Sequence, residues 1–413
     1  MGEESDLLFN CIDCGSDFFT EGERDFYVSK GFEMPKRCKK CRNKKKIRFK
    51  KEKIEESFSN LPFRSIEKTK IPLNNSATSF FIIGNGFDIM HGVKSSYYNF
   101  RDTIGKNNIL RITLENYIRQ DDVWGNFEDG LAYLDREMML STLDTWLADF
   151  DVRDEDDDDF SAANYFAAQD FATTQIYILT QELPKRFRKW ISTLKVFNTT
   201  RPVDDILIKE SRYLNFNYTE FLETIYGVPR ENVLYIHGDR RDKKTQFVLG
   251  HGHDIDEVFD EWYQSNKSRK EFQPQLLEKD GRYDYNDNLV YLGYFLKDEA
   301  MGNWKNQIRY DAINNTVDLI EDYYENSAKK TNEVISRNQS YFKSLEGIKN
   351  IIVIGHSLSK VDYPYFKEIV KYNKDSSNLK WFISWYSKDD LNRISEFVSE
   401  MNITNENVML FRV

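Results

Sequence analysis

Five short apolar runs recur along this chain of 413 residues, and longer polar or helical stretches separate them. They are SFFIIG (79–84), RYLNFN (212–217), NVLYIHG (232–238), NIIVIGHS (350–357) and LKWFISWY (379–386). Runs of this length, rich in Phe and Ile and ending at turn residues, are typical of strands buried on both faces. Because helical patterns alternate with these strands, the sequence predicts an α/β fold with a mostly parallel sheet.

Two long segments interrupt this alternation. The first, about residues 101–205, has a largely helical pattern and contains the acidic stretch DVRDEDDDD (151–159). The second, about residues 256–345, carries the helical pattern at 311–342. The last seventy residues again alternate strand and helix and end in VMLFRV (408–413). We therefore predict one large domain over residues 79–413, with two helical insertions and with the end of the chain inside the sheet.

Composition and charge exclude several classes of protein. A chain with 40% hydrophobic and 15% aromatic residues can bury more than one core, which excludes a mainly disordered protein. The formal net charge of −10 argues against a general nucleic-acid binder, although Lys and Arg crowd residues 36–53. No apolar run approaches the roughly 18–20 residues of a membrane helix, and the first residues, MGEESDLLFN, lack the basic segment and apolar stretch expected of a signal peptide. We expect a cytoplasmic protein that does not enter a membrane.

Four cysteines in two C-x-x-C pairs predict a small zinc module at residues 1–53. They are Cys11, Cys14, Cys38 and Cys41. Each pair can present two thiolates from one tight turn, and two pairs complete the tetrahedron that structural Zn²⁺ prefers. Redox or catalytic cysteines are the alternative. Residues 54–78, with Pro72 and a polar cluster as helix breakers, are expected to form a linker.

The sequence around these cysteines resembles a bacterial zinc-ribbon family over most of residues 7–45. The matching positions are Cys11, Cys14, Gly15, Phe19, Glu23, Phe26, Tyr27, Lys30, Gly31, Phe32, Pro35, Arg37, Cys38, Cys41 and Arg42. We expect a β-hairpin at residues 17–32, between the two pairs. The basic tail after Cys41 is either a surface for the phosphates of RNA or DNA, or a solvated charged helix.

A glycine loop, GNG, follows the first strand at Gly84, Asn85 and Gly86. Side chains at the two glycines would block the close approach of a phosphate or ribose, and the start of the next helix favours an anion. The sequence therefore predicts a nucleotide site here, with a plain tight turn as the alternative.

Further motifs extend this pattern through the large domain. The opening motif covers Gly84, Asn85, Gly86, Phe87, Asp88, His91, Gly92 and Tyr97, and the closing motif covers Gly355, His356, Ser357, Leu358, Asp362, Tyr365 and Phe366. Between them lie Trp124 and Glu128, Asn215 to Thr219, and Ile236 to Gly238. In these motifs residues 79–413 resemble the AbiH family of bacterial abortive-infection proteins. The resemblance implies a role in defence against bacteriophage.

The same order of motifs is similar to a distant sirtuin-like fold, which binds NAD on a Rossmann-like sheet. In this resemblance Asn217 and His237 take the positions of the catalytic Asn and His. The implied nucleotide contacts are Gly84, Asn85, Gly86, Asp88, His91, Gly355, His356, Ser357 and Asp362. Two positions depart from the pattern, because Thr219 replaces an Asp and Asp88 replaces a small hydroxyl residue.

The resemblance implies an antiphage effector that binds NAD or a related nucleotide and hydrolyses it. The histidine would accept a proton from a ribose hydroxyl while the asparagine orients ribose or water. One alternative is a metal-dependent nuclease or RNA-targeting toxin, whose ion would be held by Asp88, Glu128, His237 and His356. Another is a nucleotide sensor without chemistry.

All five histidines lie in or beside glycine loops at predicted strand ends. His251 and His253, in the LGHGHD stretch, either line the site, bind a metal with Asp254 or belong to a plain turn. Trp124 is expected to face the core. The sequence does not decide whether Glu128 faces the core or belongs to the site. A phage component or a second copy of the chain is a further candidate partner.

Overall fold

The computed structural model describes residues 9–18, 25, 27–31, 33–46, 61–73, 75–151, 161–197, 200–266, 268, 304–373 and 378–413. The acidic stretch beyond Asp151, residues 54–60 and 74 of the linker, and the basic tail beyond residue 46 lie outside these ranges. So do Phe19, Glu23, Phe26 and Phe32 of the zinc-ribbon pattern. The chain divides into two compact units, Met1–Phe63 with Tyr386–Glu396, and Arg64–Trp385 with Phe397–Val413.

The N-terminal module consists of a small hairpin and a helix. Strands β1 (Phe9–Asn10) and β2 (Asp17–Phe18) pair antiparallel, and the turn between them carries the first two cysteines. Gly15 closes that turn with a φ of 69° and donates its N–H to the carbonyl of Cys11. The predicted hairpin at 17–32 differs, because the described residues 27–29 are helical. A helix at residues 39–46 follows Cys38.

A seven-stranded sheet forms the centre of the large unit, and every pairing in it is parallel. Its strands are β3 (Arg64–Ser65), β4 (Ser79–Ile83), β5 (Arg212–Asn215), β6 (Val233–Tyr235), β7 (Asn350–Ile354), β8 (Lys380–Ser384) and β9 (Val408–Phe411). The predicted α/β fold with a parallel sheet is therefore confirmed. All strands except the two-residue β3 correspond to the apolar runs of the sequence.

The order of the strands is β3-β9-β8-β7-β4-β5-β6. Without β3, the six strands follow the doubly wound order 3-2-1-4-5-6, in which the winding direction reverses between the first and fourth strands. Here those strands are β4 and β7, and Ile83 pairs with Ile354 where they end. The Rossmann-like arrangement is thus confirmed, and its topological switch point lies at the carboxyl ends of β4 and β7.

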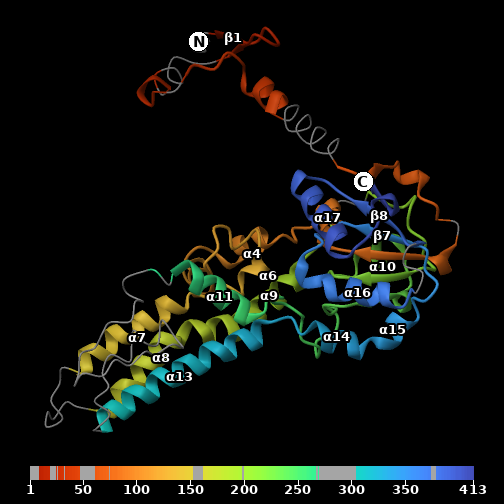
Figure 1. Cartoon of the computed structure of the whole chain (residues 1–413). Coiled ribbons are helices and arrows are strands. Elements are labelled where there is room, and N and C mark those ends of the chain that lie inside the picture. The colour runs from red at the N-terminus through yellow and green to blue at the C-terminus, as the bar shows by residue number, and fades with distance from the viewer. Residues whose placement is uncertain are drawn as a thin grey trace. The chain divides into compact units, whose positions relative to one another are not determined.

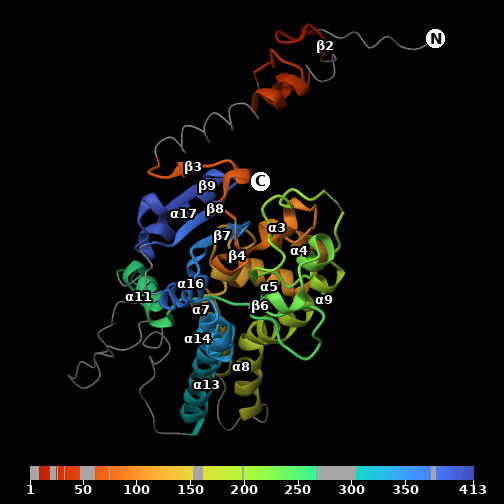
Figure 2. The ribbon, with the colours of Figure 1, turned by 90° about the vertical axis from the view of Figure 1, so that its right-hand side faces the viewer.

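Helices cover both faces of this sheet (Figure 1 and Figure 2). Phe81 and Ile83 of β4 join the large core shared with the helical insertions, whereas Phe80 and Ile82, equally buried, point to the other face. Helix α16 (Tyr363–Lys371) packs on that second face, where Phe366 lies against Trp381 of β8. Burial on both faces explains why the strand sequences are apolar without alternation.

The two helical insertions combine into one arm. Helices α7 (Arg136–Asp151) and α8 (Ala162–Tyr177) of the first insertion pack with α13 (Trp304–Ser327) of the second, and Figure 1 shows the three side by side. Among the described residues, the other α-helices of the large unit are α3 (Asn85–Met90), α4 (Tyr97–Ile104), α5 (Ile109–Tyr117), α6 (Phe127–Gly130), α9 (Leu183–Thr193), α10 (Phe221–Tyr226), α11 (Ile255–Asn266), α14 (Thr331–Arg337) and α15 (Gln339–Lys343). Helix α17 (Lys388–Glu400) precedes β9. In the described part of the chain, no helix is both long and apolar enough to cross a membrane.

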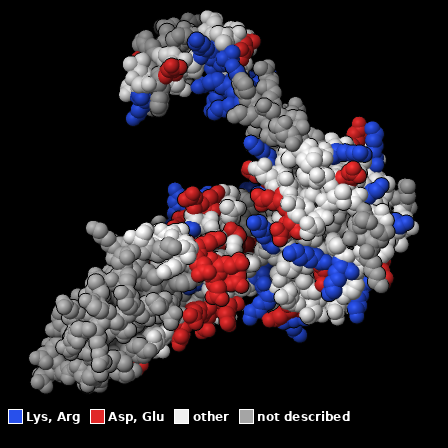
Figure 3. All heavy atoms as spheres, in the orientation of Figure 1, with Lys and Arg blue, Asp and Glu red and all other residues white. Residues whose placement is uncertain are grey.

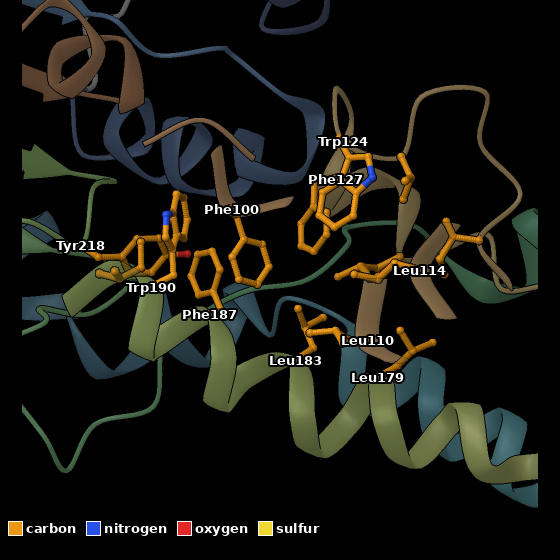
Figure 4. Close-up of a cluster of buried hydrophobic side chains, with 14 of the residues drawn as sticks. Phe100, Leu110, Leu114, Trp124, Phe127, Leu179, Leu183, Phe187, Trp190 and Tyr218 are labelled. Atoms are coloured by element: carbon orange, nitrogen blue, oxygen red, sulfur yellow. The ribbon is translucent and has the colours of Figure 1, made fainter. Parts of the chain in front are cut away.

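An aromatic cluster joins this arm to the sheet. Figure 4 labels ten of its side chains, which are Phe100, Leu110, Leu114, Trp124, Phe127, Leu179, Leu183, Phe187, Trp190 and Tyr218. Trp124 is 5% exposed and stacks on Phe127, which confirms the prediction that it faces the core. The cluster places Glu128, the residue after Phe127, at the edge of the sheet that carries the site described next.

Candidate functional site

Two glycine loops meet at the topological switch point. The N–H of Gly86 donates to the carbonyl of Gly355 over 2.7 Å, and the N–H of Gly84 donates to Ile354 over 3.0 Å. A Cβ on Gly84 would lie 2.4 Å from the Cα of His356, and one on Gly86 would lie 2.7 Å from the Cα of Gly355. Gly355 has a φ of 64°. The close approach that these glycines permit is therefore to one another, and their contact with a nucleotide stays a prediction.

Asparagine and threonine side chains after β5 bind the first loop. Asn215 accepts the N–H of Asn217 over 3.0 Å, which forms a tight turn at the end of the strand. The side-chain amide of Asn217 then donates to the carbonyl of Gly84 (3.1 Å) and to Asp88 (2.9 Å), and the hydroxyl of Thr219 donates to the other oxygen of Asp88 (2.6 Å). Asn217 is thus placed beside Gly84, as predicted for one site, with both amide protons used inside the protein.

Asp88 lies at the centre of this group and is 2% exposed. Burial raises the pKa of its carboxyl to about 7, although the hydrogen bonds from Thr219 and Asn217 act in the opposite direction. A carboxyl of this kind changes its charge near neutral pH. The two residues that depart from the sirtuin-like pattern, Asp88 and Thr219, therefore contact one another, and the hydroxyl of Thr219 donates to the carboxyl of Asp88.

His91 is 0% exposed, behind the first loop. Its Nδ1 lies 2.6 Å from the carbonyl of Phe87, and its Nε2 lies 2.8 Å from the hydroxyl of Tyr226. Burial lowers the pKa of the imidazole. A nucleotide contact at His91 stays a prediction, and it would require one of these hydrogen bonds to break.

A second polar group gathers around Asp362, just before helix α16. One carboxylate oxygen lies 3.5 Å from Nε2 of His237, and the other lies 3.5 Å from Nε2 of His356. The side chains are 4%, 3% and 7% exposed for His237, His356 and Asp362. Nδ1 of His356 accepts the N–H of Leu358 over 2.9 Å, so its neutral form carries the ring proton on Nε2, facing Asp362. The structure thus brings His237, His356 and Asp362 together.

Lys329 joins this group, although no motif of the sequence predicts it. Its ammonium lies 3.1 Å from Oδ1 of Asp362 and 2.5 Å from Oε2 of Glu128, and its side chain is 0% exposed. The hydroxyl of Tyr97 donates to the other oxygen of Glu128 over 2.6 Å. These contacts assign Glu128, which the sequence left open, to the polar group. Lys329 follows an ordinary helical stretch and precedes another lysine, so no pattern distinguishes it.

Opposite charges fix the ionisation of this buried group. Burial would raise the pKa of Asp362, but Lys329, together with His237 and His356, holds it well below its usual range. The pKa of Lys329 is raised because its two carboxylate partners outweigh the effect of burial. Burial and the nearby Lys329 lower the pKa of His237. His237 is therefore a neutral imidazole at neutral pH, which can accept a proton.

The LGHGHD loop holds the backbone of Lys329. The N–H of Lys329 donates to the carbonyl of His251 over 2.7 Å, and the N–H of His251 donates to Ser327 over 3.0 Å. A Cβ on Gly250 would lie 2.0 Å from the carbonyl oxygen of Ser327, and one on Gly252 would lie 2.7 Å from Val361. The loop therefore packs against the segments that carry Lys329 and Asp362.

Within the described residues, no second group of metal ligands accompanies the cysteines. His251 is fully buried, which lowers its pKa to about 4, and His253 lies against Asp129 and not Asp254. The set proposed for a nuclease ion, Asp88 with Glu128, His237 and His356, is not gathered within ligand distance. Asn85 and Ser357 are exposed at the same edge, and the side-chain amide of Asn85 donates to the carbonyl of Ser95.

The four thiols of the N-terminal module form a compact cluster. Their sulfur atoms all lie within 4.8 Å of one another, and those of Cys14 and Cys38 are 3.8 Å apart. A Zn–S bond of about 2.3 Å implies S···S distances of about 3.8 Å in a regular tetrahedron. The N–H of Cys41 also points to the sulfur of Cys38 at 3.5 Å. The cluster fits a structural Zn²⁺ ion.

Comparison with known families identifies both parts of the chain. A model described as a probable treble clef domain matches residues 5–50, in agreement with a zinc module. Comparison with curated proteins and with solved structures gives no match. The model described as bacteriophage abortive infection AbiH matches residues 80–385, from the first strand of the Rossmann-ordered sheet to the end of β8. The chain therefore belongs to the AbiH family of bacteriophage abortive-infection proteins.

Proposed function

We propose that the protein is an abortive-infection effector whose large unit binds NAD or a related nucleotide and hydrolyses its glycosidic bond. One observation carries this proposal. A largely buried group of ionisable side chains, formed by Glu128, His237, Lys329, His356 and Asp362, lies at the carboxyl edge of a Rossmann-ordered sheet, beside its switch point. Ligands of such sheets collect at this point, and clustered groups with shifted pKa values are typical of catalytic sites.

The charges of this group suit the reaction. The carboxylates of Glu128 and Asp362 face the single ammonium of Lys329, and His237 is neutral, so negative charge exceeds the charge of the lysine among these four residues. Cleavage of the bond between ribose and nicotinamide develops positive charge on the sugar, which a negative site stabilises. Water adds to the ribose carbon, nicotinamide leaves with the bonding electrons, and one proton is released. His237 would accept that proton, and Asp362 would stabilise the imidazolium.

Asn217 would act differently in this proposal. Because its amide protons bind Gly84 and Asp88, it would orient ribose or water through its carbonyl oxygen, or after rearrangement of the first loop. Asn85 and Ser357, which are exposed at the same edge, are the first candidates for contacts with the nucleotide phosphates.

Release of nicotinamide by the purified full-length protein tests the proposal. The protein is incubated with NAD, with and without phage lysate, and products are separated by chromatography. His237→Ala, Asn217→Ala and the double variant should reduce release by about two orders of magnitude or more, whereas Asp318→Asn, an exposed acid on α13, should not. Each variant is first compared with the wild type by thermal unfolding.

Two other outcomes separate the alternatives. Saturable binding of NAD, ADP-ribose or ATP without any product would replace the hydrolase with a nucleotide sensor. Magnesium-dependent fragments from tRNA, single-stranded or duplex substrates would support a nuclease. If the protein forms no product and none of these nucleotides raises its melting temperature, with or without lysate, the nucleotide proposal is wrong.

A second candidate function, contact with nucleic acid, concerns the zinc module alone. The helix at 39–46 exposes Lys39, Lys40, Lys44 and Lys46, and Figure 3 shows basic side chains gathered on this module. Arg37 instead pairs with Asp13, and Arg42 donates to Tyr27, so these two stabilise the module. Exposed lysines on successive turns of a helix can bind the phosphates of a nucleic-acid backbone.

Binding of labelled RNA and DNA at several salt concentrations tests this surface. Replacing Lys39, Lys40 and Lys44 by Glu should weaken binding at least about tenfold and reduce its salt dependence. The matched control replaces three exposed lysines of the large unit, Lys185, Lys330 and Lys367. Equal losses in both triple variants, or no binding by the wild type, would contradict the proposal.

A further inference from the structure

We propose that Lys329 is a positioning residue of the candidate site, whose ammonium bridges the carboxylates of Asp362 and Glu128 and holds Asp362 against His237 and His356. The inference rests on the proposed function and adds to it a residue from the second helical insertion. Lys329 is not expected to touch the nucleotide, because its side chain is completely buried. It would act through Asp362.

The geometry makes Lys329 the link between two halves of the group. Its Nζ contacts Asp362 at 3.1 Å, and the same carboxylate oxygen faces Nε2 of His237 at 3.5 Å. On the other side, Glu128 contacts both Lys329 and the hydroxyl of Tyr97. Without the ammonium, the buried carboxylate of Asp362 and the partly exposed carboxylate of Glu128 would lose the cation between them, which is unfavourable.

The backbone position of Lys329 is fixed as tightly as its side chain. The N–H of His251 donates to the carbonyl of Ser327, and the carbonyl of His251 accepts the N–H of Lys329. Gly250 lies so close to Ser327 that a Cβ on this glycine would not fit. Lys329 comes two residues after the end of α13, which packs on α8 in the arm. The helical arm thus contributes a charge to a site at the edge of the sheet.

The proposal implies a specific effect on His237. The charged groups that act on His237 are Asp362, Lys329 and Glu128, and His356 faces the other oxygen of the same Asp362 carboxylate. Tyr218 and Tyr365 pack beside the ring of His237. Lys329 opposes protonation of the imidazole and Glu128 favours it more weakly, so removal of the ammonium should make His237 easier to protonate. A larger fraction of the proton acceptor of the proposed reaction would then be protonated at a given pH.

The test combines NMR of the histidine rings with the pH profile of nicotinamide release. The chain has only five histidines, so their ring ¹⁵N signals can be followed against pH and assigned with His237→Gln. In Lys329→Met, the titration of His237 and the acidic limb of activity should both move upward by about one pH unit or more, so that nicotinamide release measured on that acidic limb should fall about tenfold or more. Lys329→Arg should restore part of the His237 titration and part of the activity. Lys330→Met, at the adjacent exposed position, should change neither the titration nor the activity.

A second variant keeps the test decisive if Lys329→Met does not fold. Lys329→Met with Glu128→Gln removes one charge of each sign, and the carbonyl oxygen of the new amide can still accept from Tyr97. The His237 titration should again move upward, because Lys329 affects His237 more than Glu128 does. Unchanged His237 signals in a folded variant, with activity lost or retained, would overturn the proposal. The ring signals do not depend on NAD, so failure of the wild type to release nicotinamide would count only against the proposed reaction.

Discussion

Gly86 and Gly355 touch through their backbones, with the N–H of Gly86 2.7 Å from the carbonyl oxygen of Gly355. This contact joins the loops after the first and fourth strands of the Rossmann order and leaves no room for a Cβ on either glycine. The geometry of the whole site depends on it, because Asn217 binds Gly84 on one side and His356 follows Gly355 on the other.

Replacing Gly86 by Ala should therefore be severely destabilising. The new Cβ would meet the backbone of Gly355, which cannot move without displacing the loop, and a loss of roughly 2–4 kcal/mol in the free energy of unfolding is expected. Urea denaturation measures it. Gly130→Ala is the matched control, because the nearest atoms to its Cβ would lie at ordinary contact distances of 3.4 Å or more. Equal effects of the two changes would contradict this account of the loops.

Asp88 should make the stability of the large unit fall as the pH rises. Its pKa is about 7 in the folded protein but near 4 in an unfolded chain, so the folded state retains a proton that the unfolded state has lost. The stabilisation is present below about pH 4 and is lost as the pH rises through about 7. The difference in unfolding free energy between wild type and Asp88→Asn should therefore decrease by roughly 2–4 kcal/mol between about pH 4.5 and 8.

The comparison with Asp88→Asn is necessary because buried histidines act in the opposite direction. His237 and His251 have lowered pKa values, so their contribution to stability is lost as the pH falls. Subtraction of the two pH profiles cancels these contributions. A constant difference over the same pH range would show that Asp88 is ionised throughout it.

Tyr226→Phe should reveal the structural role of His91. Removal of the hydroxyl leaves Nε2 of His91 buried without its partner at 2.8 Å, which should cost about 1–3 kcal/mol of stability. Chemical denaturation is the measurement, with Tyr177→Phe as a control because Tyr177 is 61% exposed. A nucleotide that binds His91 would instead bind Tyr226→Phe more tightly, because the ring nitrogen would be free.

The zinc module should lose its fold without metal. The wild type should contain one Zn²⁺ per chain by elemental analysis, and Cys38→Ser should contain much less than one. Because so small a unit has little apolar core, a chelator should also remove the hydrogen-exchange protection of residues 9–46. Ser16→Ala, a change beside Cys14 that preserves all four thiols, should retain the metal. Metal-free protein with full protection would argue for a fold that does not need zinc.

The sequence was sufficient to predict the strands of the sheet, because most of them are long enough to appear as apolar runs. Each predicted apolar run contains one of the strands β4 to β9, and the glycines after β4 and β7 indicated where the chain turns at the edge of the sheet. Parallel strands place their carboxyl ends at one edge, so the meeting of Gly84 with Gly355 could be expected. Strand β3, with two exposed residues, has no such pattern.

The candidate site was only partly predictable, for a physical reason. His237, His356 and Asp362 follow strands and therefore lie at the edge that the strands define. Lys329 comes from the end of an arm helix, and only the pairing of its backbone with His251 brings it to Asp362. Nothing in one-dimensional spacing distinguishes Lys329 from the exposed Lys330. Likewise, the sequence could not show that the two glycine loops pack closely against one another.

The short strand β3 joins the beginning of the large unit to its end. Ser65 lies opposite Leu410 of β9, and the N–H of Ile66 donates to the carbonyl of the same leucine. A protein trimmed to the matched family region, 80–385, would lack both strands and would present β8, with its apolar Trp381 and Ile383, as a bare edge. Unpaired edges of this kind recruit other chains, so such a fragment should self-associate whatever its activity. Any shortened form of the large unit should therefore begin at or before Arg64 and retain Phe411.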